Sequence, residues 1–284
     1  MKIKKIGVIG AGQMGRGIAQ VAAFKGFDVQ LFDVSSESLD FAVGFITKQL
    51  ARSVEKGRCD QKTMDESLAR LKTASKLDEL SDCDLLVEAA TENKAIKLEI
   101  FKNMDSIAKK GAILASNTSS ISITEIAAVT NRPQDVCGMH FMNPVPVMKL
   151  VEGIRGLETS DETFNTVAAC SEEMGKVFVK ANDMPGFAVN RILMPMINEA
   201  VYTLHEGIAS VEDIDTAMKL GTNVPMGPLE LGDFIGLDTC LAIMNVLHEG
   251  LGDTKYRPCP LLKQYVASGR FGRKSGQGFY NYAK

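Results

Sequence analysis

The chain has 284 residues, enough for one large domain or two ordinary ones, and 45% of them are hydrophobic, which allows extensive cores. The 32 basic and 35 acidic residues give a net charge of −3, so the composition argues against nucleic acid or an anionic membrane as partner. The sequence has no run of 18 apolar residues, so it predicts no membrane span. Six cysteines without a C-x-x-C pair and only three histidines argue against a disulfide framework or a metal site, and favour a reducing, cytoplasmic setting.

The first predicted element is a short buried strand that runs into a glycine-rich turn. Residues 2–9 predict a parallel strand and residues 14–25 predict a helix. Between them, Gly10 permits a tight turn, Gly12 lets the backbone approach a pyrophosphate, and Gly15 lets helix and strand pack closely. The N–H groups and the positive dipole end of the helix then face the pyrophosphate.

The second strand, residues 28–33, ends in an acidic side chain. Asp33 follows the glycines by about 20 residues, where a carboxylate binds the ribose hydroxyls of NAD. A surface aspartate at a strand end is the plainer alternative, but the order strand, loop, helix, strand and acid favours a nucleotide site. No arginine directly follows Asp33 to neutralise a 2′-phosphate, so the sequence predicts NAD(H) rather than NADP(H).

A helical excursion then interrupts the alternation of strands and helices. Ser35 or Ser36 caps a predicted helix that runs to residue 56, and a second helix at 62–71 returns the chain. The basic residues Lys48, Arg52 and Lys56 recur at i, i+4 and i+8 on the polar face of the first helix. A solvated helix face is the plain interpretation of this stripe.

The rest of the first domain alternates again. Strands are predicted at 84–89, 112–116, 136–141, 147–151 and 176–179, with helices at 94–109, 122–129 and 161–174 between them. Polar loops follow two of the strands, at 91–93 and 117–120. Ligands bind outside the carboxyl ends of strands in open α/β sheets, so these loops are candidate site segments.

A Pro-Gly break within residues 182–186 marks the best domain boundary. We therefore expect an α/β, Rossmann-type domain at 1–183, followed by an all-α domain at 184–284. Helices are predicted in the second domain at 187–205, 211–220, 229–247 and 261–267, the third being interrupted by Gly232 and Gly236.

His140 stands at the end of a predicted strand, beside Asn143 and a proline-braced turn. A lone histidine on an apolar strand is often only a core residue. Glu152, however, follows the next predicted strand, and an antiparallel return would bring it to the imidazole. A carboxylate fixes the histidine tautomer and stabilises the imidazolium. Oxidation of an alcohol needs such a base, because the hydroxyl loses a proton as its carbon loses hydride.

Several long motifs together identify a family. They are ASNTSS at 115–120, HFMNPVPVMKLVE at 140–152, PGFAVNR at 185–191, DIDTAMKLG at 213–221, PMGP at 225–228 and KSGQGFY at 274–280. With them the chain resembles the L-3-hydroxyacyl-CoA dehydrogenases along almost its whole length. It is most similar to the compact bacterial 3-hydroxybutyryl-CoA dehydrogenases among them.

The resemblance implies a role for each matching residue. His140 matches the catalytic base and Glu152 its orienting carboxylate, while Ser119 and Asn190 match residues that hold the substrate oxygens. Arg52 and Lys56 lie in the helix that contacts coenzyme A in this family. The implied cofactor contacts are Gly10, Gly12, Gln13, Met14, Gly15, Asp33, Ala89, Glu92, Lys97, Asn117, Ser119 and Asn143. The family also implies an acyl-CoA substrate and a homodimer formed by the helical domain.

Two other functions remain open from the sequence. Dehydrogenases of free 3-hydroxy acids share the two-domain plan, but they use a lysine in the helical domain, and no matching motif is present here. A non-catalytic NADH-binding or structural member of the same family is the second alternative. The presence of Ser119, His140, Glu152 and Asn190 argues against it.

Overall fold

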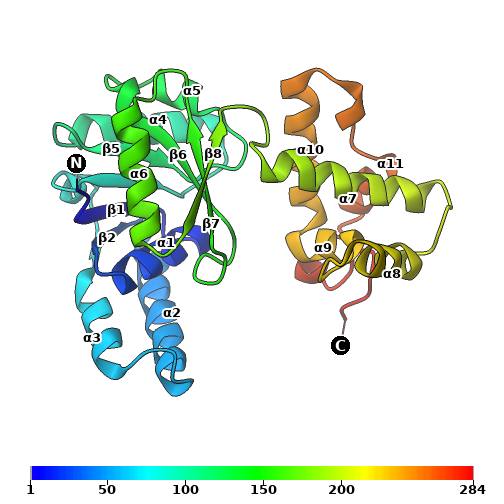
Figure 1. Ribbon diagram of the computed structural model, residues 1–284, viewed down its shortest axis with the longest axis horizontal. Coiled ribbons are helices and arrows are strands. Elements are labelled where there is room, and N and C mark those ends of the chain that lie inside the picture. Colours follow the sequence, from blue (N-terminus) through cyan, green and yellow to red (C-terminus); the bar gives the residue numbers. More distant parts are fainter. Residues whose placement is uncertain (1, 284) are drawn as a thin grey trace. The chain divides into compact units, whose positions relative to one another are not determined.

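The computed structural model describes residues 2–283, and Figure 1 shows its helices and strands in sequence colours. The contacts within the chain divide it into two compact units, Met1–Met184 and Pro185–Lys284. The boundary expected from the sequence falls one residue earlier.

The first unit is built on one eight-stranded sheet with the order β3-β2-β1-β4-β5-β6-β7-β8. The strands are β1 (Lys5–Ile9), β2 (Asp28–Phe32), β3 (Leu71–Ala74), β4 (Leu85–Glu88), β5 (Ile113–Ser116), β6 (Val136–Phe141), β7 (Leu150–Arg155) and β8 (Val177–Asn182). All neighbouring pairs are parallel except β6 and β7, which are antiparallel. The Rossmann-type arrangement predicted from the sequence is confirmed.

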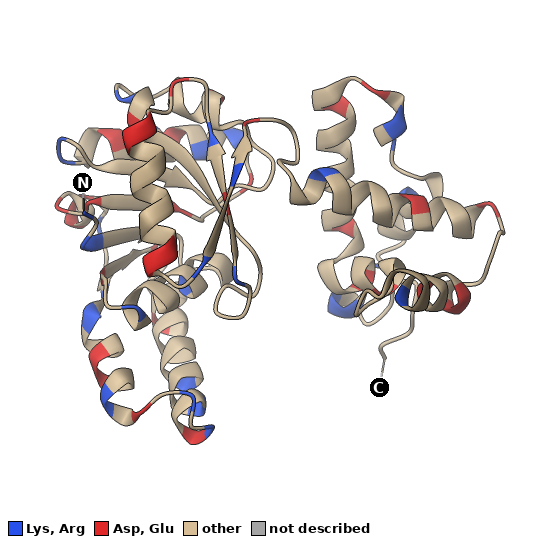
Figure 2. Ribbon diagram, viewed as in Figure 1, with Lys and Arg blue, Asp and Glu red and all other residues tan. Residues whose placement is uncertain are grey.

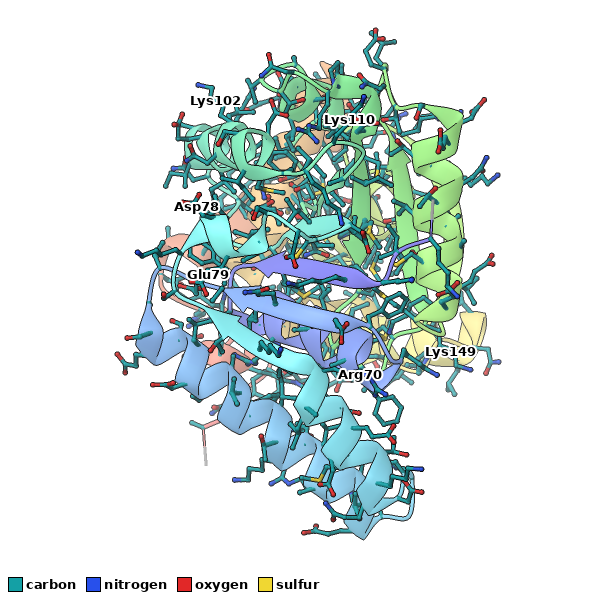
Figure 3. The ribbon with its side chains drawn as sticks, turned by 90° about the vertical axis from the view of Figure 1, so that its left-hand side faces the viewer. Arg70, Asp78, Glu79, Lys102, Lys110 and Lys149 are labelled. Carbon is teal, nitrogen blue, oxygen red and sulfur yellow. The ribbon has the colours of Figure 1, made fainter. Side chains whose placement is uncertain are left out.

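Helices cover both faces of this sheet. They are α1 (Gln13–Phe24), α2 (Ser36–Glu55), α3 (Gln61–Arg70), α4 (Lys94–Ile107), α5 (Ile123–Ala127) and α6 (Asp161–Glu173). Buried side chains of α1 and α6 share one hydrophobic core with β1, β2 and β6, and Figure 1 shows α6 on the near face of the sheet with α4 and α5 behind it. Helices α2 and α3 run side by side past the β3 edge (Figure 3).

The strand that carries Glu152 differs from the prediction. The sequence placed a strand at 147–151, but β7 begins only at Leu150 and runs on to Arg155. Val147 and Met148 look like strand residues, yet both donate their N–H groups to the carbonyl of Pro144 at 3.0 Å, which closes a turn. Their backbone is therefore not available to the sheet, and Glu152 lies inside β7 rather than after it.

The edge strand β3 was not predicted at all. It has only four residues, and Lys72 and Thr73 in its middle are exposed. A short, polar edge strand carries no apolar alternation, because only one side of it is paired and little of it is buried. Its parallel partner β2 is what organises it.

The second unit is helical, with α7 (Val189–His205), α8 (Val211–Thr222), α9 (Pro228–Ile235), α10 (Leu237–Leu251) and α11 (Pro260–Ala267). The break between α9 and α10 falls at Gly236, whose φ of 106° favours glycine, while Gly232 stays within α9. Two buried aspartates fasten the C-terminal segment. Asp233 accepts from the N–H groups of Phe279 and Tyr280 at 3.0 and 2.9 Å, and Asp215 accepts from the Tyr280 hydroxyl at 2.8 Å.

Within residues 2–283, no single helix has the length and apolar composition to cross a membrane. The helices α9 and α10 taken together have the length and apolar composition of a span, but they are bent by 99° at their break.

Candidate active site

The glycine loop has the local geometry that its sequence predicts. Gly10 has a φ of 104°, and a Cβ on Gly15 would lie 1.7 Å from the Gly10 carbonyl oxygen, so only glycine allows α1 to pack this closely. Gly12 is exposed, and nothing lies within 4 Å of where its Cβ would stand. The backbone at the N-terminus of α1 is therefore open to a ligand, as a pyrophosphate requires.

Asp33 braces the same loop. One carboxylate oxygen accepts from the Ala11 N–H at 2.7 Å and the other from the Ser35 N–H at 2.9 Å. Ser35 in turn caps α2 through its hydroxyl. A carboxylate has about four acceptor positions, so Asp33 can also accept from the hydroxyls of a ribose.

A buried ion pair lies at the carboxyl ends of β4 and β5. The Lys97 ammonium pairs with Glu88, and both side chains are almost completely buried. The same Glu88 carboxylate accepts from the Ser116 hydroxyl at 2.8 Å and from the Ala90 N–H at 2.9 Å. Lys97 thus helps to fix the turn after β4 through Glu88. Its direct contact with the cofactor stays a prediction.

Above this pair, Glu92 joins the loops that follow β4 and β5. Its carboxylate accepts from the Thr118 hydroxyl at 2.7 Å, from the Ser119 N–H at 2.7 Å and from the Ser119 hydroxyl at 3.0 Å. Glu92 and Ser119 are 27 residues apart in sequence, and these bonds hold their two loops together at the carboxyl ends of adjacent strands. Glu92 and Ser119, predicted separately, form one cluster.

The next connection leads to the histidine. The Asn117 side-chain oxygen accepts from the Phe141 N–H at 2.9 Å, which ties the β5 loop to the end of β6 beside His140. In the antiparallel ladder His140 lies directly opposite Glu152. Its Nδ1 atom lies 2.8 Å from the Glu152 carboxylate, His140 is only 7% exposed, and Glu152 is fully buried.

This register turns a sequence separation of twelve residues into a hydrogen bond. Directly opposed residues on antiparallel strands have neighbouring side chains. Because Nδ1 is engaged by the carboxylate, any proton transfer by His140 to a ligand would use its Nε2 atom. Histidine and carboxylate form a buried pair beside the loops at the strand ends.

The loop between β6 and β7 touches the glycine loop. The Gln13 side-chain amide donates to the Asn143 side-chain oxygen at 3.0 Å. Val145 of the same loop packs on α1, where a Cβ on Gly17 would lie 2.9 Å from the Val145 Cβ. The β6–β7 hairpin, which carries His140 and Glu152 and is called the acid–base hairpin below, therefore contacts the predicted nucleotide loop within the first unit.

Comparisons with known proteins show which family the chain belongs to. Residues 5–184 match the family model described as 3-hydroxyacyl-CoA dehydrogenase, NAD binding domain, and residues 186–282 match the C-terminal domain of the same family. The chain belongs to the 3-hydroxyacyl-CoA dehydrogenase family. The family and the cofactor class predicted from the motifs are confirmed.

Full-length relatives carry a narrower name. A Bacillus subtilis protein called probable 3-hydroxybutyryl-CoA dehydrogenase is 59% identical and covers 99% of this chain and 98% of its own length. The 3-hydroxybutyryl-CoA dehydrogenase of Clostridioides difficile is 51% identical, covering 99% of this chain and all of its own. The crystal structure of (S)-3-hydroxybutyryl-CoA dehydrogenase PaaH1 from Ralstonia eutropha matches with a TM-score of 0.98 and 49% identity over the whole of both chains.

The other site residues predicted for this chain lie outside the Glu92–Ser119 cluster and the His140–Glu152 pair. Arg52 and Lys56 are exposed in and just after the last turn of α2, and Figure 2 shows basic residues there, where α2 extends away from the sheet. Asn190 is buried in the first turn of α7, in the second unit. Ala89 donates its N–H to Ile9 at 2.8 Å, and Met14 lies half-buried in α1.

The residues that sequence reasoning missed are the supporting ones. Glu88 and Ser116 end the apolar strands β4 and β5, and Thr118 lies beside the predicted Ser119. A glutamate at the end of a buried strand, followed nine residues later by a lysine, was the available signal. Nothing local distinguishes it from an ordinary strand end, because the partners come from three separate segments.

Proposed function

We infer that the protein is an NAD-dependent (S)-3-hydroxyacyl-CoA dehydrogenase that interconverts 3-hydroxybutyryl-CoA and acetoacetyl-CoA. The reaction is (S)-3-hydroxyacyl-CoA + NAD⁺ ⇌ 3-oxoacyl-CoA + NADH + H⁺. The observation that carries the proposal is the buried 2.8 Å contact between His140 Nδ1 and Glu152 at the edge of the strand-end loops. The full-length relatives named for this reaction support the substrate class.

His140 performs the proton transfer in this proposal. In oxidation the neutral imidazole accepts the hydroxyl proton at Nε2, and in reduction the imidazolium returns it to the carbonyl oxygen. Glu152 accepts from Nδ1, which selects the tautomer that has Nε2 as acceptor and stabilises the cation once it forms. The buried position of the pair strengthens this electrostatic support.

The glycine loop, Asp33 and the cluster of Glu92 with Ser119 are proposed to hold the dinucleotide, which when bound accepts or supplies the hydride. The open backbone at Gly12 and the spare acceptor positions of Asp33 fit its pyrophosphate and ribose. The full set of proposed contacts is Gly10, Gly12, Gln13, Met14, Gly15, Asp33, Ala89, Glu92, Lys97, Asn117, Ser119 and Asn143.

The substrate contacts are proposed to divide between its two ends. Ser119 and Asn190 orient the oxygens of the acyl group, and the exposed charges of Arg52 and Lys56 attract the phosphates of coenzyme A. The stripe on α2 then has a function beyond solvation. Exposed ion pairs contribute little individually, so this contact assists binding more than it determines specificity.

A homodimer through the second unit and a cytoplasmic location complete the proposal. Large apolar side chains are exposed on this unit, including Ile192 at 72% and Leu220 at 82%. Exposed apolar side chains are available for an interface with another chain where they gather into one patch. All six cysteines, which lie within the described residues, are free thiols, as is usual in a reducing compartment.

The test is NADH oxidation followed by absorbance, with acetoacetyl-CoA and free acetoacetate compared at equal concentration. We expect turnover with the thioester and a kcat/KM for the free acid that is lower by orders of magnitude. Turnover of free acetoacetate alone would indicate a free hydroxy-acid dehydrogenase. NADH binding without turnover of either compound would indicate a non-catalytic member of the family.

A further inference from the structure

Lys176 is a buried lysine that the proposed chemistry does not use. It lies just before β8, is only 8% exposed, and its ammonium donates to the carbonyls of Val145 and Met148, the latter at 2.8 Å. Both acceptors are neutral. Burial lowers the pKa of the Lys176 ammonium below its ordinary value, and the like charge of Lys25 acts in the same direction. A buried ammonium is costly, so these two hydrogen bonds must offset a real desolvation penalty.

The two carbonyls belong to the loop that joins the strands of His140 and Glu152. This β6–β7 loop, residues 142–149, has exposed side chains at Asn143, Val147 and Met148, so few apolar contacts hold it. Lys176 is hydrogen-bonded to Val145 in the middle of the loop and to Met148 near its C-terminal end. The adjacent Val177 N–H also donates to the Lys149 carbonyl at 2.7 Å, which continues the attachment into β8.

On its other side the same loop contacts the nucleotide-binding part of the unit. Val145, whose carbonyl accepts from Lys176, is 2% exposed and packs against Gly17 of α1. Asn143 accepts from Gln13 of the glycine loop at 3.0 Å. The loop is therefore held between the Lys176 ammonium and α1, and it reaches both the acid–base hairpin and the glycine loop.

We propose that Lys176 is a positioning residue for the reaction: its ammonium fixes the β6–β7 loop on α1 and so sets both the glycine-loop contact of Asn143 and the alignment of the His140–Glu152 pair. The proposal rests on the function inferred above for His140 and Glu152. The hydrogen bonds of the Lys176 ammonium go to carbonyls of the loop, so its proposed effect on the pair passes through the loop.

The test replaces Lys176 with methionine, which is unbranched, is one heavy atom shorter and lacks the donor. The matched control is Lys149→Met, the same change at an exposed lysine of the same loop, which Figure 3 shows projecting from the edge of the molecule. The chain has no tryptophan, so NADH binding is followed by the fluorescence of the nicotinamide itself. Kinetics with acetoacetyl-CoA and the melting temperature complete the set.

We expect Lys176→Met to weaken NADH binding by about tenfold and to lower kcat by a similar factor, as the loss of a hydrogen bond from a charged donor would. The KM for acetoacetyl-CoA and all properties of Lys149→Met should stay within about twofold of wild type. Because NADH binding needs no turnover, a failure of the proposed function would show separately, as an inactive wild type that still binds NADH.

A second variant keeps the test decisive if Lys176→Met does not fold. Val145→Ala retains the ammonium and its two acceptors but loosens the contact of the loop with α1, and it should change NADH affinity and kcat in the same direction. If folded Lys176→Met keeps both values within about twofold of wild type, whether or not its melting temperature falls, Lys176 is only a structural residue and the proposal is wrong. If Lys176→Met does not fold, the same result in Val145→Ala overturns the proposal, because the loop contact then does not set NADH affinity or kcat.

Discussion

At the scale of single residues, we expect Asp33 to determine the choice between NADH and NADPH. Its carboxylate braces the glycine loop through Ala11 and Ser35 and has acceptor positions left for a ribose diol, while its charge repels a 2′-phosphate. We expect Asp33→Ser to weaken NADH binding and to narrow the preference for NADH over NADPH. Dissociation constants for both cofactors check this, and a wild type that prefers NADPH would contradict the account.

The sequence could place a residue beside the glycine loop where its position is set locally, and could not where the partners are distant. Asp33 could be placed there because one strand and one helix fix its spacing from the glycines, while its role as a cofactor ligand stays a prediction. Glu88 could not, because its partners Ser116 and Lys97 come from β5 and α4. A buried lysine such as Lys176 is equally unpredictable, since nothing in its neighbours' sequence reveals the carbonyls that it contacts.

At the scale of elements, α2 offers a direct test of substrate binding. Arg52 and Lys56 lie one helical turn apart and are exposed, so they can face the same phosphates. We expect charge reversal at both to raise the KM for acetoacetyl-CoA several-fold with NADH affinity little changed. The effect should shrink as salt is added, because exposed charges are screened within about 10 Å at 0.1 M ionic strength.

Lys62→Glu is the control for this change. Lys62 lies on the adjacent helix α3 and its side chain is 82% exposed, so reversing it alters the net charge of the helical excursion without touching α2. A KM for acetoacetyl-CoA that rises equally in the control would indicate a general field effect. An unchanged KM for acetoacetyl-CoA in the double variant would mean that Arg52 and Lys56 are ordinary residues of a solvated helix face.

The elements also show why pattern alone misplaces a strand. The apolar residues Val147 and Met148 suggested a strand start, but the Pro144 carbonyl uses their N–H groups in a turn. The real strand β7 contains Glu152 and Gly153, which are poor strand formers by composition. Its position is set by pairing with β6, and that pairing is what brings Glu152 to His140.

At the scale of the whole molecule, the proposed substrate contacts include one residue from each unit. Ser119 belongs to the first unit and Asn190 to the second, and each is proposed to hold an oxygen of the acyl group. Correct orientation lowers the barrier as well as the dissociation constant. We expect Ser119→Ala and Asn190→Ala to lower kcat by at least about tenfold each, measured at saturating acetoacetyl-CoA. A rise in KM with unchanged kcat in both would mean uniform binding only.

The overall architecture was predictable because it repeats simple units. Strand, loop and helix patterns along the first unit gave the parallel sheet, and the change to continuous helical patterns near residue 184 gave the second unit. The positions of β3 and β7 and the supporting network at the strand ends were not predictable, because long-range pairing rather than local pattern determines them. The acid–base pair lies between these cases: both residues were recognised, but only the β6–β7 register shows them bonded.

The central claim is that His140, oriented by Glu152, is the general acid and base. General acid–base catalysis contributes about 10²–10⁴-fold, so we expect His140→Ala to lose roughly that factor in kcat. Glu152→Gln should lose less in oxidation than in reduction at neutral pH, because a neutral imidazole still accepts a proton.

The decisive measurement is kcat of His140→Ala in both directions. Deuterium at the transferred position of NADH for reduction, and at C3 of 3-hydroxybutyryl-CoA for oxidation, shows whether chemistry limits each rate. Circular dichroism and NADH binding show whether the fold is intact. The account predicts a loss of about 10²-fold or more with NADH affinity retained. A folded His140→Ala enzyme whose chemical step stays within about fivefold of wild type would contradict it and make this histidine an ordinary residue of the core.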